Sequence, residues 1–157
     1  MSEICLCVGM IASGKSTYCK QKGKEGWVVI NDDAIVNMLH GGTYTLYNKT
    51  WKPLYKAIED NILHIAIAMN KSVIIDRGVD ISIKSRTRWI AIAHSLETPI
   101  KAIVFERFTP EIHARRRFES DDRGHDYEYW LNTAKAHSLR YENPTIEEGF
   151  CEIEFIQ

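Results

Sequence analysis

The residues from Gly9 to Ser16 read Gly-Met-Ile-Ala-Ser-Gly-Lys-Ser, which fits the spacing G-x-x-x-x-G-K-[ST] at every fixed position. Glycines let the backbone wrap tightly enough for its N–H groups to face an anion. The lysine supplies a positive charge for the β- and γ-phosphates of a nucleotide, and the serine hydroxyl can ligate Mg²⁺. The pattern predicts a loop that holds ATP and Mg²⁺, with contacts from Gly9, Ala12, Ser13, Gly14, Lys15, Ser16 and Thr17.

Three aspartates follow short apolar runs: the pair Asp32 and Asp33, and then Asp76. In an open parallel sheet the ligand lies beyond the carboxyl ends of the strands, where the phosphate loop also lies. Phosphoryl transfer to a hydroxyl needs a carboxylate that receives the proton, and Asp33 is the predicted base. Asp32 or Asp33 could also cap a helix. Asp76 is predicted to hold the metal together with Ser16, or else to be a turn residue paired with Arg77.

Arginines gather near residues 110–130, where Arg115, Arg116 and Arg117 precede a polar stretch that contains Arg123. Small P-loop kinases close a mobile arginine-bearing segment over the γ-phosphate, which excludes water and adds positive charge. We predict such a lid here, with Arg123 as a catalytic residue and Arg116 as a nucleotide contact, Arg117 being an alternative. A solvated basic helix face would give the same composition.

Other P-loop proteins fit the sequence less well. The base-recognition motif N-K-x-D of GTPases has no match, because Asn48-Lys49-Thr50-Trp51 carries tryptophan at the position of the aspartate. At 157 residues the chain is also short for a motor ATPase. An ATP-dependent phosphotransferase is therefore the favoured class.

The elements that must position these residues alternate along the chain. Apolar runs predict five strands, and periodic stretches between them predict helices, which favours a three-layer α/β/α P-loop NTPase fold with a parallel five-stranded sheet and a helical lid. In the longest helix, Leu54, Ile58, Ile62, Ile65 and Met69 recur at helical spacing. The predicted strands are Ile4–Val8, Trp27–Ile30, Ser72–Asp76, Lys101–Phe105 and Phe150–Ile156, and the helices are Lys15–Lys22, 33–40, Thr50–Asn70, Ile83–His94, Pro110–Arg117 and Glu128–Tyr141.

Composition limits the remaining classes. Twenty Lys and Arg against 21 Asp and Glu leave a net charge of −1, so contact with a nucleic acid would need a local basic patch. The four cysteines form no C-x-x-C pair. No stretch approaches the roughly 18 apolar residues of a membrane span. We expect one cytoplasmic P-loop kinase domain over residues 1–157, without a membrane segment.

Four pieces of the sequence together resemble the 5′-hydroxyl polynucleotide kinase family, with the kinase domain of the phage-type enzyme as the comparison. They are G-M-I-A-S-G-K-S-T, I-N-D-D, V-I-I-D-R-G and Arg86-Thr87-Arg88-Trp89, in matching order between Ile4 and about Tyr141. The resemblance implies that Asp33 is the general base and that Arg123 contacts the β- and γ-phosphates. The family's acceptor-binding arginine falls on Val36, and its D-x-T-N falls on Asp76-Arg77-Gly78-Val79, which leaves Arg77 as a possible replacement cation.

The sequence leaves more than one candidate for the molecule that accepts the phosphoryl group. The resemblance implies the 5′-hydroxyl of a polynucleotide, whereas Val36 and the near-neutral charge favour a small metabolite or a nucleoside. A nucleotide-dependent regulatory module with little turnover is a further alternative. The aromatic residues Tyr127, Tyr129, Trp130 and Tyr141 would either stack bases of a single strand or pack within their helix.

Overall fold

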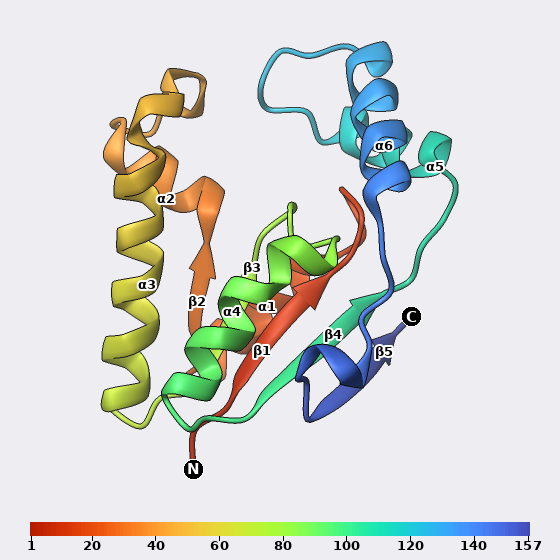
Figure 1. Ribbon diagram of the computed structural model, residues 1–157. Helices are drawn as coiled ribbons and strands as arrows, with labels where there is room; N and C mark the ends of the chain where they lie inside the picture. The colour runs from red at the N-terminus through yellow and green to blue at the C-terminus, as the bar shows by residue number, and fades with distance from the viewer.

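A computed structural model describes all residues from 1 to 157 and contains one parallel sheet of five strands in the order β2-β3-β1-β4-β5. Figure 1 shows the strands with their carboxyl ends toward the same side of the molecule. The predicted fold class is confirmed. The strands are β1 (Ile4–Val8), β2 (Val28–Asn31), β3 (Val73–Asp76), β4 (Ile100–Phe105) and β5 (Glu152–Ile156). The α-helices are α1 (Lys15–Lys24), α2 (Asp32–Leu39), α3 (Lys52–Ala68), α4 (Ile83–Ser95), α5 (Pro110–Glu119) and α6 (Tyr127–Arg140).

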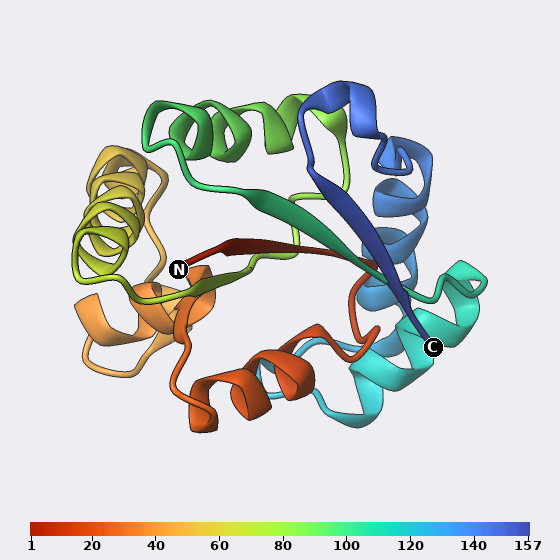
Figure 2. The same cartoon turned by 90° about the horizontal axis from the view of Figure 1, so that it is seen from below.

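Helices cover both faces of the sheet, as the view along the sheet in Figure 2 shows. Side chains of β1 point alternately to the two faces. Ile4, Leu6 and Val8 belong to the larger core with α3 and α4, whereas Cys5 and Cys7 belong to a smaller core with α1. Because β1 is buried on both faces, it appears in the sequence as a continuous apolar run.

Helices α5 and α6 pack against each other beyond the carboxyl ends of β1 and β4, around Ala114, Trp130 and Ala134. The polar segment 120–126 lies between them, and the predicted lid of about 110–130 corresponds to α5, this segment and the start of α6, which we call the lid region. On the other side of the same edge, α2 and the start of α3 are joined by residues 40–51, which contain two short 3₁₀ turns at Tyr44–Leu46 and Lys49–Trp51. None of the helices combines the length and hydropathy that a membrane span needs.

Two local expectations were wrong. Helix α1 continues past Gly23 to Lys24, and the chain turns instead at Gly26, whose φ of 97° favours glycine. Neither Asp32 nor Asp33 caps α2, because the cap is Asn31, whose Oδ1 accepts a hydrogen bond from the N–H of Ala34 at 2.7 Å.

The apolar repeat of helix α3 is only partly buried, because Ile58 and Ile62 pack against the main core whereas its other members do not. Leu54, Ile65 and Met69 are exposed, and the buried side chains are Tyr55, Glu59, Leu63 and Ala66. The helix is rotated so that Glu59 reaches two arginines, Arg77 at 3.3 Å and Arg88 at 3.0 Å. A buried carboxylate needs such partners, and apolar periodicity does not record them.

Candidate active site

The loop between β1 and α1 has the backbone shape that phosphate binding requires. Gly14 has a φ of 99°, and Ala12 also lies in the left-handed region with a φ of 50°. A Cβ placed on Gly9 would lie 2.5 Å from the Ser13 Oγ and 3.0 Å from the Phe105 Cβ. Glycine is therefore required at position 9 by the close approach of its neighbours, and at position 14 by its dihedral angle.

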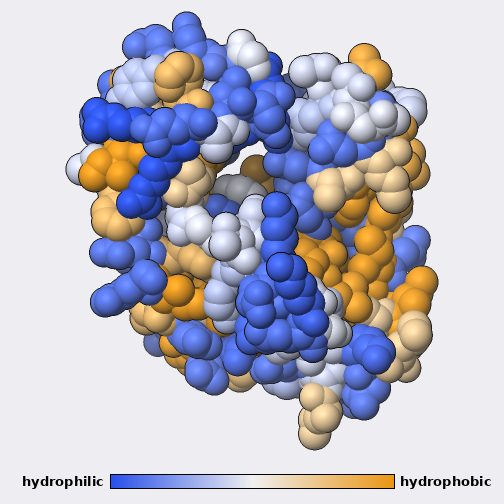
Figure 3. Space-filling view, turned by 180° about the vertical axis from the view of Figure 1, so that it is seen from behind, coloured by the Kyte–Doolittle hydropathy of each residue, from blue (hydrophilic) through white to orange (hydrophobic).

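This loop forms one wall of a cavity of about 760 Å³ at the carboxyl edge of the sheet. Figure 3 shows the hollow between two lobes with hydrophilic side chains. The first turn of α2, residues 42–45 and the lid line the rest of it. Of the predicted nucleotide contacts, Ala12, Ser13, Gly14, Lys15, Ser16 and Thr17 line this cavity.

Lys15 lies folded over the phosphate loop. Its Nζ donates hydrogen bonds to the carbonyl oxygens of Gly9 at 2.9 Å and Met10 at 2.7 Å. Burial lowers the pKa of Lys15, and the negative charge of Asp76 acts in the opposite direction. A third contact is the Ser13 hydroxyl at 3.4 Å. A buried ammonium whose hydrogen-bond partners are all neutral is suited to gain a phosphate as its partner.

Asp76 is brought to Ser16 as predicted, and it has a second partner that sequence reasoning missed. Its Oδ2 accepts hydrogen bonds from the Ser16 hydroxyl at 2.9 Å and from the Asn31 side-chain amide at 2.8 Å. Asn31 and Asp76 are paired in register at the ends of β2 and β3. The register of neighbouring strand ends is the signal that could have identified Asn31.

The pair of Ser16 and Asp76 fits Mg²⁺, which prefers oxygen ligands and is typically bound by one or two carboxylates together with substrate phosphates and water. No group of three or more His, Cys, Asp or Glu side chains could hold a metal ion without such help. This donor set therefore favours a metal that arrives with the nucleotide.

Asp33 and Arg123, 90 residues apart in the sequence, meet across the cavity. The Arg123 Nη2 lies 2.7 Å from the Asp33 Oδ2, and the Asp33 side chain is 49% exposed. The guanidinium of Arg123 also lies over the ring of Tyr44, 3.5 Å from its centroid. Next to this pair, burial and the neighbouring Asp33 charge raise the pKa of Asp32 to about 7.

The arginines of α5 divide between two directions. Arg117 lines the cavity, donates to the Asp122 carboxylate at 2.9 Å and lies over the Trp130 ring. Arg116, which we predicted to contact the nucleotide, lies over the Phe108 ring and outside the cavity lining. Consecutive helical residues point about 100° apart, so only one of the two can face the cavity. The geometry favours Arg117 over Arg116.

Two departures from the resembled family have a structural consequence. Val36 is 4% exposed and belongs to the main core, so its position faces the sheet rather than an acceptor. Arg77 lies outside the cavity lining, in contact with Glu59 at 3.3 Å and Asp80 at 3.1 Å. Asp32, at 3.9 Å, is a third carboxylate beside Arg77. In this conformation the three carboxylates hold Arg77 away from the cavity, where a replacement cation would have to lie.

Asp80 lies at the buried end of this ionic group and is fully inaccessible. Burial raises the pKa of Asp80 to about 7, although Arg77 acts to lower it. The other charged groups that affect it are Glu59, which raises its pKa, and Arg88, which lowers it. The group follows the strand end that carries Asp76, and Asp32 is its member in the cavity lining.

Comparison with known proteins agrees with this geometry. An AAA domain family model matches residues 4–141, which is most of the chain and includes the phosphate loop, the three aspartates and the lid. The chain belongs to this family. This AAA domain protein is also 31% identical, over 97% of its length, to the bifunctional polynucleotide phosphatase/kinase of Schizosaccharomyces pombe. It spans 33% of that relative.

Solved structures share the fold of this AAA domain at low sequence identity. A candidate kinase from Chloroflexus aurantiacus has a TM-score of 0.71 at 14% identity, over 99% of this chain and 84% of that one. A chain of the Pnkp1/Rnl/Hen1 RNA repair complex has a TM-score of 0.68 at 17% identity, over 90% of this chain and 46% of that one. A gluconokinase from Sinorhizobium meliloti has a TM-score of 0.55 at 17% identity, over 99% of this chain and 81% of that one. The fold is that of P-loop kinases.

Three of the four aromatic residues that we considered as stacking platforms make packing contacts instead. Trp130 is buried beneath Arg117, Tyr127 packs edge-on against Phe118, and Tyr141 lies under Arg107. Trp130 and Tyr127 pack within the lid region and Tyr141 packs against the main core, so all three follow the packing interpretation. The cavity wall instead carries Tyr44, which we did not single out, because a lone tyrosine in a Gly-Thr-Tyr-Thr segment gives no periodic signal.

Proposed function

We propose that this protein is an ATP-dependent kinase that transfers the γ-phosphoryl group to the 5′-hydroxyl of a polynucleotide. The observation that carries the proposal is the meeting of Asp33 and Arg123 at 2.7 Å on the wall of the cavity that Lys15 also lines. A carboxylate and a lid cation beside a phosphate loop are the groups that phosphoryl transfer to a hydroxyl requires. Similarity to a polynucleotide phosphatase/kinase supports this choice of acceptor.

In this proposal each group has one task. Lys15 contacts the β- and γ-phosphates, and Ser16 with Asp76 holds Mg²⁺, which neutralises phosphate charge when it is bound. Asp33 receives the proton of the attacking hydroxyl. Arg123, which is paired with Asp33 in this structure, turns to the transferred phosphoryl group and leaves the carboxylate to the acceptor. Arg117 is the second lid cation that faces the cavity.

A second candidate is a kinase for a small hydroxyl metabolite or a nucleoside. The observation that favours it is the burial of Val36, because the position that corresponds to the acceptor-binding arginine of the resembled family lies in the core. The chain's net charge of −1 also offers no general attraction for a polyanion.

The test is transfer of label from γ-³²P-ATP in the presence of Mg²⁺. Short 5′-hydroxyl DNA and RNA oligonucleotides would be compared with a panel of nucleosides and sugars, and the Lys15→Ala variant would serve as the blank. We expect label at the 5′ ends of the oligonucleotides. Label on a small acceptor alone would refute the polynucleotide proposal, and ATP binding without any labelled acceptor would refute the kinase proposal.

A further inference from the structure

Tyr44 forms part of the cavity wall beside the proposed base. It follows α2 within the segment 40–51, and it lines the cavity together with Thr43, Thr45 and Asp33. The Arg123 guanidinium covers one face of its ring at 3.5 Å from the centroid. A planar guanidinium stacked on a tyrosine occupies the kind of place that a flat aromatic ligand would occupy.

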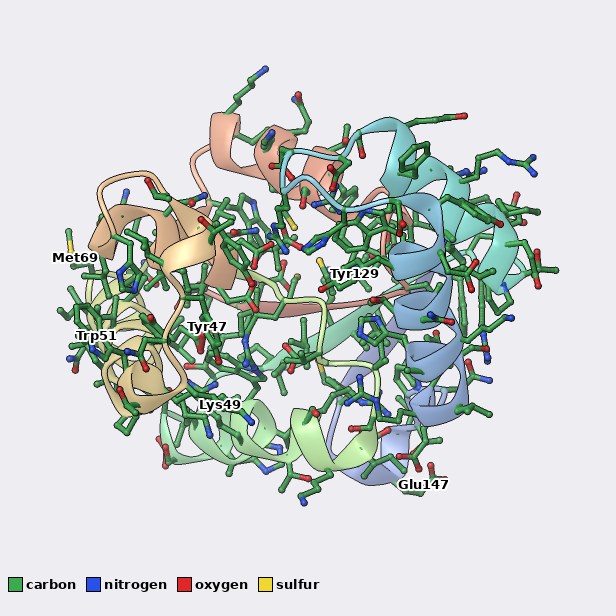
Figure 4. All side chains as sticks on the ribbon, turned by 90° about the horizontal axis from the view of Figure 1, so that it is seen from above. Tyr47, Lys49, Trp51, Met69, Tyr129 and Glu147 are labelled. Atoms are coloured by element: carbon green, nitrogen blue, oxygen red, sulfur yellow. The ribbon has the colours of Figure 1, made fainter.

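Other rings hold Tyr44 from behind. The rings of Tyr44 and Tyr47 are nearly parallel, with centroids 6.3 Å apart, and Tyr47 stacks in turn on Tyr55 at 5.5 Å. Tyr55 is buried, and its hydroxyl is fixed by a 2.6 Å hydrogen bond with the His40 Nε2. Figure 4 shows Tyr47 on the inner side of this segment and Tyr129 across from it on the lid. The orientation of the Tyr44 ring is therefore set before any ligand arrives.

Arg123 has two tasks in this account. In this structure it lies on Tyr44 and pairs with Asp33, whereas the proposed function has it turn to the phosphates of ATP. When it turns to the phosphates, it uncovers the Tyr44 ring and the Asp33 carboxylate together. The vacated space is flat, is bounded on one side by an aromatic ring, and lies next to the proposed base.

Resting on the proposed function, we propose that the face of Tyr44 on which Arg123 lies binds, once Arg123 has moved, the nucleobase of the acceptor's 5′-terminal nucleotide. A base stacked there would place its own sugar, and hence the 5′-hydroxyl, beside Asp33. Stacking on an aromatic ring accepts every base because each base has a π-face. With Val36 buried in the core, this contact supplies acceptor recognition that the chain does not obtain from a phosphate-binding arginine at that position.

The proposal has a consequence for the order of events. Because Arg123 covers Tyr44 in this structure, ATP that draws Arg123 away should strengthen acceptor binding, and by linkage the acceptor should strengthen ATP binding. Tyr129 is the matched control, because it is also an exposed tyrosine, stacked on His125 at 3.6 Å, but it lies outside the cavity lining.

The test compares two 5′-hydroxyl oligonucleotides that differ only in the 5′-terminal nucleotide, which is either ordinary or abasic. With the wild-type protein we expect the abasic acceptor to have a KM about tenfold higher. Tyr44→Leu should raise the KM of the ordinary acceptor by about the same factor and show no further loss with the abasic one, whereas Tyr129→Leu should leave the KM of the ordinary acceptor unchanged.

The outcomes separate the two proposals. If the wild-type protein labels both oligonucleotides with the same KM, the nucleobase site is refuted while the polynucleotide kinase stands. A KM that rises in Tyr129→Leu but not in Tyr44→Leu refutes it as well. If neither oligonucleotide is labelled although ATP binds, the proposed function and the nucleobase site both fail. The abasic comparison uses the unchanged protein, so it does not depend on how the variants fold.

Discussion

Replacing Asp33 by asparagine should separate catalysis from folding. The change keeps the size of the side chain and an oxygen that can accept the hydrogen bond from Arg123, but it removes the group that takes up a proton. A general base contributes about 10²- to 10⁴-fold to a rate, which is about 3–5 kcal/mol of the activation free energy. We expect kcat to fall within that range.

The stability of the variant should change little. The Asp33 side chain is half-exposed, and an ion pair in such a position contributes about 0–1 kcal/mol to the free energy of unfolding. Urea unfolding should therefore place Asp33→Asn within about 1 kcal/mol of the wild type, and calorimetry should find the ATP Kd nearly unchanged. A suitable control is Asp60→Asn on α3, outside the cavity, which removes the carboxylate of the 2.7 Å ion pair with Arg88 of α4.

The assay is single-turnover transfer of label at saturating ATP and acceptor. The control should transfer at the wild-type rate and Asp33→Asn should not. A rate for Asp33→Asn within about threefold of the wild type, with the fold intact, would refute the assignment of the base.

Three further predictions concern residues other than the proposed base and the lid arginines. Gly9→Ala places a Cβ 3.0 Å from that of Phe105, so we expect calorimetry to find the ATP Kd raised about tenfold; an unchanged Kd would contradict the steric argument. Because the pKa of Asp80 is raised from 3.8 to about 7, the folded protein keeps a proton that the unfolded chain releases. The free energy of unfolding should therefore fall by up to about 1.4 kcal/mol per pH unit as pH rises from about 4 to about 7, and urea unfolding should find this slope reduced in Asp80→Asn. Arg86→Ala leaves the Glu148 carboxylate without the buried partner that it contacts at 2.8 Å and 3.1 Å, so we expect urea unfolding to show a loss of about 3–5 kcal/mol; a loss below about 1 kcal/mol would contradict it.

The sequence by itself determined the phosphate loop and the strand that precedes it. All the required groups lie within eight consecutive residues, and their conformation depends on local sterics at Gly9 and Gly14 and on the helix that begins at Lys15. It also determined the parallel sheet, because strands that are buried on both faces appear as continuous apolar runs between helical segments. The positions of Asp33 and Asp76 at strand ends followed from that topology.

Only the tertiary structure decided which side chains meet. Whether Arg116 or Arg117 faces the cavity depends on the rotation of α5, which is set by packing against α6. The burial of Glu59 follows in the same way from the rotation of α3 toward Arg77. These contacts join residues far apart in the chain, and a helix rotated by one position changes all of them at once. Sequence patterns constrain each element separately, so the pairing of Arg123 with Asp33 had to come from the packed molecule.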